Sequence, residues 1–397
     1  MKQISQRFDI DRAVGYAVAA RVWQLLTGQV TALLIVFCLT DIEFGYYYAF
    51  TWLLGMQIFV ELGLHVVIIN VASHEWSELK SVDGEVDGSP RALSRLASLN
   101  RMAVRWYLFA AAIFVIAVSV AGIVYFNYGA IVGELAVPAD QSDFQWFSPW
   151  IVLVTLTGLQ LGLLPMTSIL EGCGQLPTIN QFRFWQGMAG SFVVWSLIFG
   201  SFGVWALCGS AAVRLIGESW LALGRYRTFF TSLRKQPPSD VLDWKLEVVP
   251  LQWRIAGQGA LHWFSTHLAG LVLFKVHGVA VGGRFGLMWT VLTAVQGASL
   301  AWIDTRRPLF GRLIAEGNFT ELDRQYFRLS RISIALVFAG AATFTLGVLV
   351  VNTYSNSVFD TIAARLPDAL VVGVFSLAFV ALQPALCANI SVRAHKR

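Results

Sequence analysis

The sequence contains few charged residues. Only 13% of its 397 residues are Asp, Glu, Lys or Arg, whereas 56% are hydrophobic, and the mean hydropathy is +0.62. Soluble globular domains carry about 25% charged residues, so this composition excludes that class and indicates a membrane protein. The formal net charge is +5. In a membrane protein the informative feature is which loops carry the Lys and Arg residues, because that distribution sets the orientation. No nucleic-acid partner is expected.

Catalytic and metal-binding patterns are also missing. Four cysteines, Cys38, Cys173, Cys208 and Cys387, stand singly without CxxC spacing, which excludes a disulfide framework and a zinc site. The sequence has no HExxH, Walker A or GxSxG motif. The longest predicted outer loop, about 127–148, carries three acids and no base, which weighs against a membrane glycosyltransferase or polymerase. We predict no catalytic residue, no metal and no cofactor, and expect that the protein is not an enzyme.

Long apolar runs dominate what is present. A bilayer core requires about 20 mostly apolar residues in a helix. The first run is longer than a signal-peptide core and is followed by no cleavage pattern, so we expect it to stay in the mature protein. The sequence predicts an all-α polytopic membrane protein with about ten transmembrane helices, at residues 13–39, 46–72, 104–126, 149–170, 182–200, 202–222, 251–275, 285–303, 332–351 and 366–389.

The basic residues orient these spans. Most of the 29 Lys and Arg residues fall on one side of the predicted topology, in segments 1–12, 73–105, 171–183, 223–254, 304–331 and the tail from Arg393. Because Lys and Arg are enriched in cytoplasmic loops, both termini are expected in the cytoplasm, with the hairpins at Asp41, 134–143 and 360–368 outside. We expect a bacterial inner membrane location. The internal loops mix acids and bases, as solvated linkers or short surface helices do.

An internal repeat is visible in the hairpins. A shift of 241 positions places Phe44-Gly45 on Phe285-Gly286. The same shift aligns Arg21 with His262, Trp23 with Phe264, and Tyr48 with Trp289. This predicts two bundles in parallel orientation: residues 1–222 form a first bundle of six helices, 223–250 a cytoplasmic linker, and 251–397 a second bundle of four helices, truncated relative to a twelve-helix transporter.

Three stretches carry a family resemblance. They are "DIEFGYYYAFTWLLGMQIFVELGL", "ILEGCGQLPTINQFRFWQGMAG" and "GRFGLMWTVLTAVQGASLAW". Together they resemble the polysaccharide biosynthesis and export flippases, including O-antigen flippases, of the multidrug/oligosaccharidyl-lipid/polysaccharide (MOP) superfamily. The resemblance implies translocation of a polyprenyl-diphosphate-linked oligosaccharide across the inner membrane during surface polysaccharide or lipopolysaccharide synthesis. Membrane lipids, and a polysaccharide polymerase or glycosyltransferases, would be its other partners.

Glu61 and His65 lie inside a predicted span, one helical turn apart. Ionisable side chains are costly in a membrane, about 2.5–3.5 kcal/mol on insertion scales, and therefore indicate function by default. Residues at i and i+4 share a helix face and can interact. We interpret the two as an ion-coupling pair. A structural ion pair that orients helices is an equal alternative.

The candidate substrate-binding residues are Arg21, Trp23, Arg214, His262 and Trp289. Arg21 suits a diphosphate because guanidinium binds it bidentately. The tryptophans suit sugars or a prenyl tail, although buried packing is their commoner use. Arg214 repeats the i,i+4 geometry with Glu218, and the alternative for it is a snorkelling surface pair. His262 aligns with Arg21, and the alternative for it is a hydrogen-bonded core histidine.

Three other functions stay open. One is an ion-coupled small-molecule exporter of the same superfamily. Another is a non-transporting membrane scaffold for polysaccharide assembly, which the truncated second bundle keeps in view. The third is a polymerase or outer-leaflet glycosyltransferase, which would convert its substrate chemically.

Overall fold

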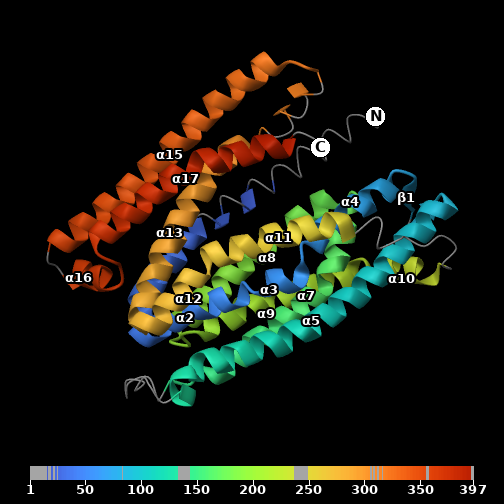
Figure 1. Ribbon diagram of the computed structural model, residues 1–397. Coiled ribbons are helices and arrows are strands. Elements are labelled where there is room, and N and C mark those ends of the chain that lie inside the picture. Colours follow the sequence, from blue (N-terminus) through green and yellow to red (C-terminus); the bar gives the residue numbers. More distant parts are fainter. Residues whose placement is uncertain are drawn as a thin grey trace.

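The protein is helical along most of its length (Figure 1). The computed structural model describes residues 16, 19–20, 23–24, 26–82, 84–132, 144–236, 249–304, 306, 309–310, 313–314, 316–354 and 357–394. The predicted all-α class is confirmed, and the strands described form one short hairpin.

Among the described residues, five helical segments are long and apolar enough to cross a membrane. Their length of 21 residues or more matches the about 20 residues that a bilayer core requires. They are Pro90–Asn127 in α5 (Pro90–Val132), Phe147–Gly172 (α7), Trp205–Arg225 (α9, Trp205–Ser219, and η1, Trp220–Arg225), Phe319–Thr353 (α15) and Ala369–Val392 in α17 (Ala369–Ala394).

The other predicted spans are helical and less apolar. Residues 182–200 fall in α8 (Leu176–Phe199), which carries Gln181, Arg183 and Gln186. The 251–275 span corresponds to α11 (Val249–Thr266) and α12 (Leu268–His277), and the 285–303 span lies in α13 (Val279–Asp304). Of the first span, Leu26–Cys38 is an apolar helix, and part of that span lies outside the described residues.

The predicted span 46–72 is interrupted by a bend. The segment divides into α2 (Asp41–Leu54), α3 (Gln57–Glu61) and α4 (Leu64–Trp76), and the two halves meet at 47°. The bend falls where Leu62 and Gly63 adopt left-handed backbone conformations, with φ of 51° and 65°. Left-handed geometry ends an α-helix, and Gly63 supplies it without steric cost. Counted as one span, the bent pair makes a sixth.

The helices pack in two groups. The larger group contains α4, α5, α7, α8 and α9, and the smaller contains α13, α15 and α17. Figure 1 shows α15 and α17 side by side, with α13 between them and the larger group. Helix α2 packs against α12 and α13, and α11 packs against α3, so these elements join the groups. The division at residues 222 and 251 stays a prediction.

The two ends of the molecule differ. We call the end where the chain reverses at Thr40, Ser201, Gly278 and Arg365 the turn end. Contacts bring these turns together: Glu43 lies against Gly203, Val279 against Gly45, and Arg365 against Asp41. At this end Thr40 caps α2 through a reciprocal bond with Glu43, a sequence-encoded helix start.

The opposite end, which we call the linker end, carries a strand hairpin that the sequence did not predict and a short helix in the expected linker. Strands β1 (Leu79–Val82) and β2 (Glu85–Gly88) form an antiparallel hairpin in the expected loop 73–105. Helix α10 (Arg227–Lys235) occupies part of the expected linker and packs against α5 and β2. Both were expected to be solvated linkers or surface helices, so the strands are a correction. A short helix α16 (Ser357–Ala364) lies between α15 and α17.

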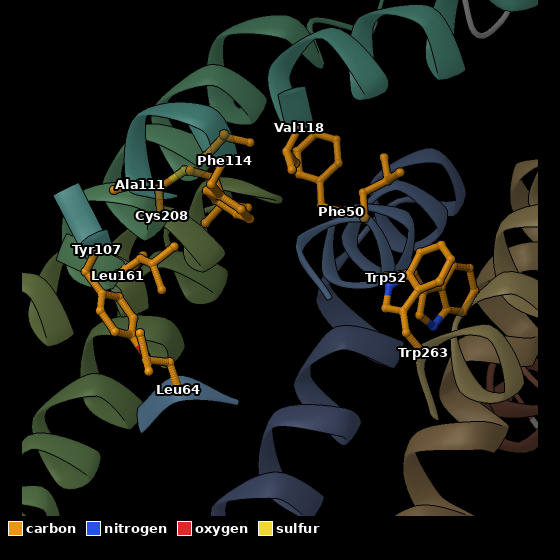
Figure 2. Packing of buried hydrophobic residues seen from close by; sticks show 14 of the residues in the cluster. Phe50, Trp52, Leu64, Tyr107, Ala111, Phe114, Val118, Leu161, Cys208 and Trp263 are labelled. Atoms are coloured by element: carbon orange, nitrogen blue, oxygen red, sulfur yellow. The ribbon is translucent and has the colours of Figure 1, made fainter. Parts of the chain in front are cut away.

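Aromatic side chains fill the core next to α2 and α5. Figure 2 shows Tyr107, Phe114 and Val118 along α5, and Phe50 on α2. Phe50 is fully buried, with its ring 5.0 Å from that of Trp150. Aromatic pairs at such separations contribute about 0.5–1.5 kcal/mol beyond area burial.

Candidate functional site

Glu61 and His65 contact one another, although they lie on different helices. The bend at Leu62-Gly63 separates them, yet His65 Nδ1 approaches the Glu61 carboxylate as an ion pair. The Glu61 side chain is 15% exposed and that of His65 40% exposed. The acid is thus held inside the fold while the imidazole reaches its edge. Their role in ion coupling stays a prediction.

A second ion pair lies close by. Arg183 of α8 binds Glu171 at the end of α7, and both are near enough to His65 to interact with its charge. Glu171 is 16% exposed and Arg183 47% exposed. Both lie in the expected internal segment 171–183 and gave no signal in the sequence, because only tertiary packing brings the end of α7 against α4. The larger group therefore holds two neighbouring ion pairs rather than one.

Arg214 and Glu218 do not form the pair that their spacing suggested. Glu218 accepts a hydrogen bond from Gln160 Nε2 at 3.2 Å, and Gln186 Nε2 donates to the backbone carbonyl of Arg214 at 3.0 Å. The Arg214 side chain is exposed. Glu218 is thus hydrogen-bonded to α7. The exposed Arg214 side chain can reach a ligand or the membrane interface. Among the described residues no group of three His, Cys, Asp or Glu residues is placed to hold a metal ion.

The two candidate tryptophans pack within opposite parts of the molecule. Trp23 lies against Phe192 of α8, with ring centroids 6.2 Å apart, and its buried indole N–H has no hydrogen-bond partner among the described residues. Trp289 lies between Phe285 and Phe379, at 5.5 and 5.1 Å. The packing alternative therefore describes Trp289. An unpaired N–H leaves Trp23 able to donate to a ligand.

His262 and His267, near the break between α11 and α12, lie in different surroundings. His262, the predicted substrate ligand, is exposed on α11. His267 lies at the break between α11 and α12, stacked on Trp263 at an interplanar angle of 4° and facing Gly55. The sequence favoured His262 through the repeat alignment and gave no signal for the helix break. Arg21 lies outside the described residues.

Glycines bring α2 into close contact with α12 and α13. An added Cβ at Gly45 would overlap the backbone of Val279, one at Gly286 would overlap Tyr48, and one at Gly270 would lie 2.5 Å from Trp52. Only glycine permits such close approach. Gly45 and Gly286 are the residues that the repeat aligned, and here each lies against the other half of the chain.

Arg365 binds across the turn end. Its guanidinium lies 2.6 Å from an oxygen of Asp41, donates to the Leu39 carbonyl at 2.6 Å, and is 4.9 Å from the ring centre of Phe44. We call these four residues the Arg365 latch. The Arg365 side chain is 11% exposed, whereas that of Asp41 is 76% exposed. The latch joins the α16–α17 turn to the start of α2, 326 residues apart.

A second cross-contact supports the latch. Lys275 Nζ of α12 donates to the Tyr125 carbonyl of α5 at 2.9 Å, and the Tyr125 hydroxyl donates to the Leu271 carbonyl at 2.6 Å. The Lys275 ammonium also lies 5.6 Å from the Tyr125 ring centre. These reciprocal bonds close the turn end on a second side of α2.

Away from these contacts a pocket opens between the N-terminal helical segment and the smaller group. Its volume is about 440 Å³, and it is lined by Gln24, Gly297, Ala298, Leu300, Ala301, Asp304 and Ile390. Ala301 and Asp304 end α13, the helix whose first residue lies at the turn end, so the pocket is near the linker end. Its lining is mainly apolar, with Gln24 and Asp304 as polar groups.

The fold matches that of solved transporters. The chain is similar to a multidrug resistance MATE family transporter of the MOP superfamily in an inward-facing conformation, with a TM-score of 0.56 and 14% identity over 96% of this chain and 82% of that one. It is also similar to a mutant of the Vibrio cholerae MATE transporter VcmN, with a TM-score of 0.50 and 12% identity over 98% of this chain and 85% of that one. Neither a family model nor a curated protein matches the sequence. The chain therefore has a MATE-like fold and is a multi-pass membrane protein.

Proposed function

We propose that this protein is a transporter that moves a polyprenyl-diphosphate-linked oligosaccharide from the cytoplasmic to the outer leaflet of the bacterial inner membrane. The observation that carries the proposal is the asymmetry between its ends. The turn end is held by the Arg365 latch and by glycine-mediated packing of α2, and its pocket of about 410 Å³ beside Arg284, Leu366 and Asp368 is mainly polar. The pocket between the N-terminal helical segment and the smaller group, toward the other end, is mainly apolar. A lipid-linked substrate needs this combination, because it must enter from one leaflet and be released toward the other.

The chemistry of the lining fits an amphipathic cargo. The apolar side of the pocket, formed by Leu300, Ala301 and Ile390, suits a prenyl chain. The headgroup would meet the guanidinium groups of Arg183 and Arg214 on the larger group, which suit a diphosphate. Arg21, which lies outside the described residues, remains the predicted diphosphate ligand. Trp23, with its unpaired N–H, would contact the sugars.

Glu61 and His65 would couple this movement to an ion. Opening of the turn end requires a ligand that binds the two states with different affinity. An acid held at 15% exposure beside an imidazole can gain or lose a proton or cation as water reaches it. The neighbouring Arg183–Glu171 pair lies in range to respond to that change.

The second candidate is an ion-coupled exporter of small molecules. It is favoured by the likeness to a solved multidrug resistance transporter. The two candidates predict different cargo and share the closed turn end. A scaffold or polymerase would require neither the latch nor the coupling pair.

Reconstitution separates these functions. Purified protein is placed in vesicles that contain either a fluorescent polyprenyl-diphosphate oligosaccharide or a fluorescent organic cation. A lectin added outside reports the leaflet of the lipid, and quenching reports cation uptake. Lipid translocation that Glu61→Gln slows, and that the exposed hairpin control Glu85→Gln leaves unchanged, supports the proposal. Cation uptake with lipid movement no faster than in protein-free vesicles would select the exporter, and failure of both would remove transport.

A further inference from the structure

Helix α10 and the turn of helix before it carry one sign of charge. Residues 220–236 contain four basic residues and no Asp or Glu. All four are exposed, and none forms an ion pair within the described part of the chain. They are Arg225, Arg227, Arg234 and Lys235. In the neighbouring hairpin, Asp87 pairs with Lys80 at 3.8 Å, and Glu85 forms no ion pair with a described residue.

The packing of α10 fixes which way this basic surface faces. Phe229, Phe230 and Leu233 are buried against the protein. Phe229 lies against Trp76, with ring centroids 6.1 Å apart, and Ser232 Oγ accepts from the Val86 N–H at 3.4 Å. At about 100° of rotation per residue, Lys235 lies opposite this buried side, and Arg227 and Arg234 lie at its flanks, about 90–115° from its centre. All three side chains are exposed.

Both ends of α10 lie near the edge of the apolar membrane surface. Before its start, Trp220 and Leu223 are 56% and 53% exposed, so the lipid-facing surface of that span continues to Leu223. Arg225 follows at about 3 Å along the axis. At the other end Arg101 Nη1 donates to the Gln236 carbonyl at 2.9 Å. Arg101 lies about 10 Å along α5 from Leu108, which is 58% exposed.

Both ends of α10 are thus close to the edge of the exposed apolar surface. Charges within about 8–10 Å of a surface interact with it at physiological ionic strength. Exposed tryptophan beside arginine is typical of the membrane interface.

We propose that the basic face of α10 binds the headgroups of anionic phospholipids at the linker end. Guanidinium groups bind phosphate oxygens bidentately, and α10 presents them without competing carboxylates. The bound lipid would fix the position of α10, and through Arg101 and the hairpin that of the first residues of α5. This inference does not depend on the identity of the transported cargo.

Native mass spectrometry of the purified full chain tests it. The protein is exchanged into detergent containing equal amounts of dioleoyl phosphatidylglycerol and dioleoyl phosphatidylcholine, and the retained lipids are counted. Each basic residue near the surface contributes about fivefold to anionic-lipid binding. We expect the variant with Arg225, Arg227, Arg234 and Lys235 all changed to Gln to lose at least about tenfold of the preference for phosphatidylglycerol.

Three controls make the result specific. Replacing the three arginines by Lys should keep most of the preference. Changing Arg324, Arg328 and Arg331 to Gln removes exposed charge from α15, where Glu321 lies 3.8 Å from Arg324. This variant should keep the preference for phosphatidylglycerol within about twofold of the wild-type value. Soluble glycerophosphoglycerol should not compete.

An equal loss in the α15 control would show that only total charge matters and would overturn the proposal. So would an unchanged preference in the α10 variant. Full competition by glycerophosphoglycerol would assign the surface to a soluble anion instead of a membrane.

Discussion

At the turn end, α2 approaches α12 and α13 so closely that glycine is needed at Gly45 and Gly286. At the same end, Arg365 binds Asp41 at the start of α2. Near the linker end, a pocket beside Gln24 and Ala301 separates the N-terminal helical segment from the smaller group. The turn end is joined by a few directional bonds beside a mainly polar pocket, whereas the pocket near the linker end is mainly apolar.

The difference shows that a small change in free energy is enough to open the turn end. A hydrogen bond to a charged group contributes about 1.5–3 kcal/mol. The differential affinity of one substrate or ion for two states is of similar size, about 1–3 kcal/mol. A latch built from Arg365 and two or three partners is therefore strong enough to hold the turn end closed and weak enough for a ligand to open it.

The largest change should come from filling the glycine contact. Gly45→Ala places a methyl group against the Val279 backbone, which cannot move aside as a side chain does. We expect a loss of about 1–3 kcal/mol in the free energy of unfolding, as for overpacked cores, measured by thermal unfolding in detergent. Gly187→Ala on α8, where a Cβ meets nothing within 4 Å, is the matched control. Equal stability of the two variants would contradict a close α2–α13 contact.

Breaking the latch should shift the balance between the two ends. Arg365→Ala removes the bond to Leu39, the ion pair with Asp41 and the contact with Phe44, and should favour the open turn end by about 1–3 kcal/mol. The reporter is a cysteine at the buried position Val279 in a Cys38→Ser background, whose labelling rate should rise about tenfold. A labelling rate that Arg365→Ala leaves unchanged would mean that the latch does not hold this end.

The coupling pair should affect transport and not stability. Glu61→Gln keeps the shape of the side chain and removes its charge, so unfolding should change by less than about 1 kcal/mol. Transport driven by an ion gradient should fall at least about tenfold, while exchange without a gradient continues. Vesicle assays with and without the gradient measure both. Gradient-driven transport at the wild-type rate would leave Glu61–His65 as a structural pair.

The smallest change is expected at the exposed partner of the latch. Asp41 is 76% exposed, and exposed ion pairs contribute about 0–1 kcal/mol. Asp41→Asn should therefore raise the labelling of position 279 less than Arg365→Ala does, because Arg365 keeps Leu39 and Phe44. An effect as large as that of Arg365→Ala would show that the ion pair, and not the backbone bond, holds the latch.

Local sequence signals account for most of the helices. Apolar runs of sufficient length predicted α5, α7, α15 and α17, and the Thr40 to Glu43 capping pair marks the start of α2. The contact of Glu61 with His65 also follows from spacing, even though the bend between them does not.

Non-local contacts account for what the sequence did not predict. Arg365 and Asp41, or Arg183 and Glu171, meet only after helices pack, and no spacing rule joins residues so far apart in the chain. The bend at Leu62 escaped detection because it requires a left-handed leucine, which sequence patterns disfavour. The hairpin at residues 79–88 is short and polar, so its composition resembled that of a loop.

Distance measurements at both ends in one protein test the central claim most directly. Spin labels at Phe202 and Val358, both exposed, report the turn end, and labels at Gln24 and Ala301 report the pocket. We predict that the lipid-linked oligosaccharide lengthens the first distance and shortens the second, and that Arg365→Ala produces the same pair of changes without substrate. Distances that stay fixed, or that lengthen together, would contradict a molecule that opens one end as it closes the other.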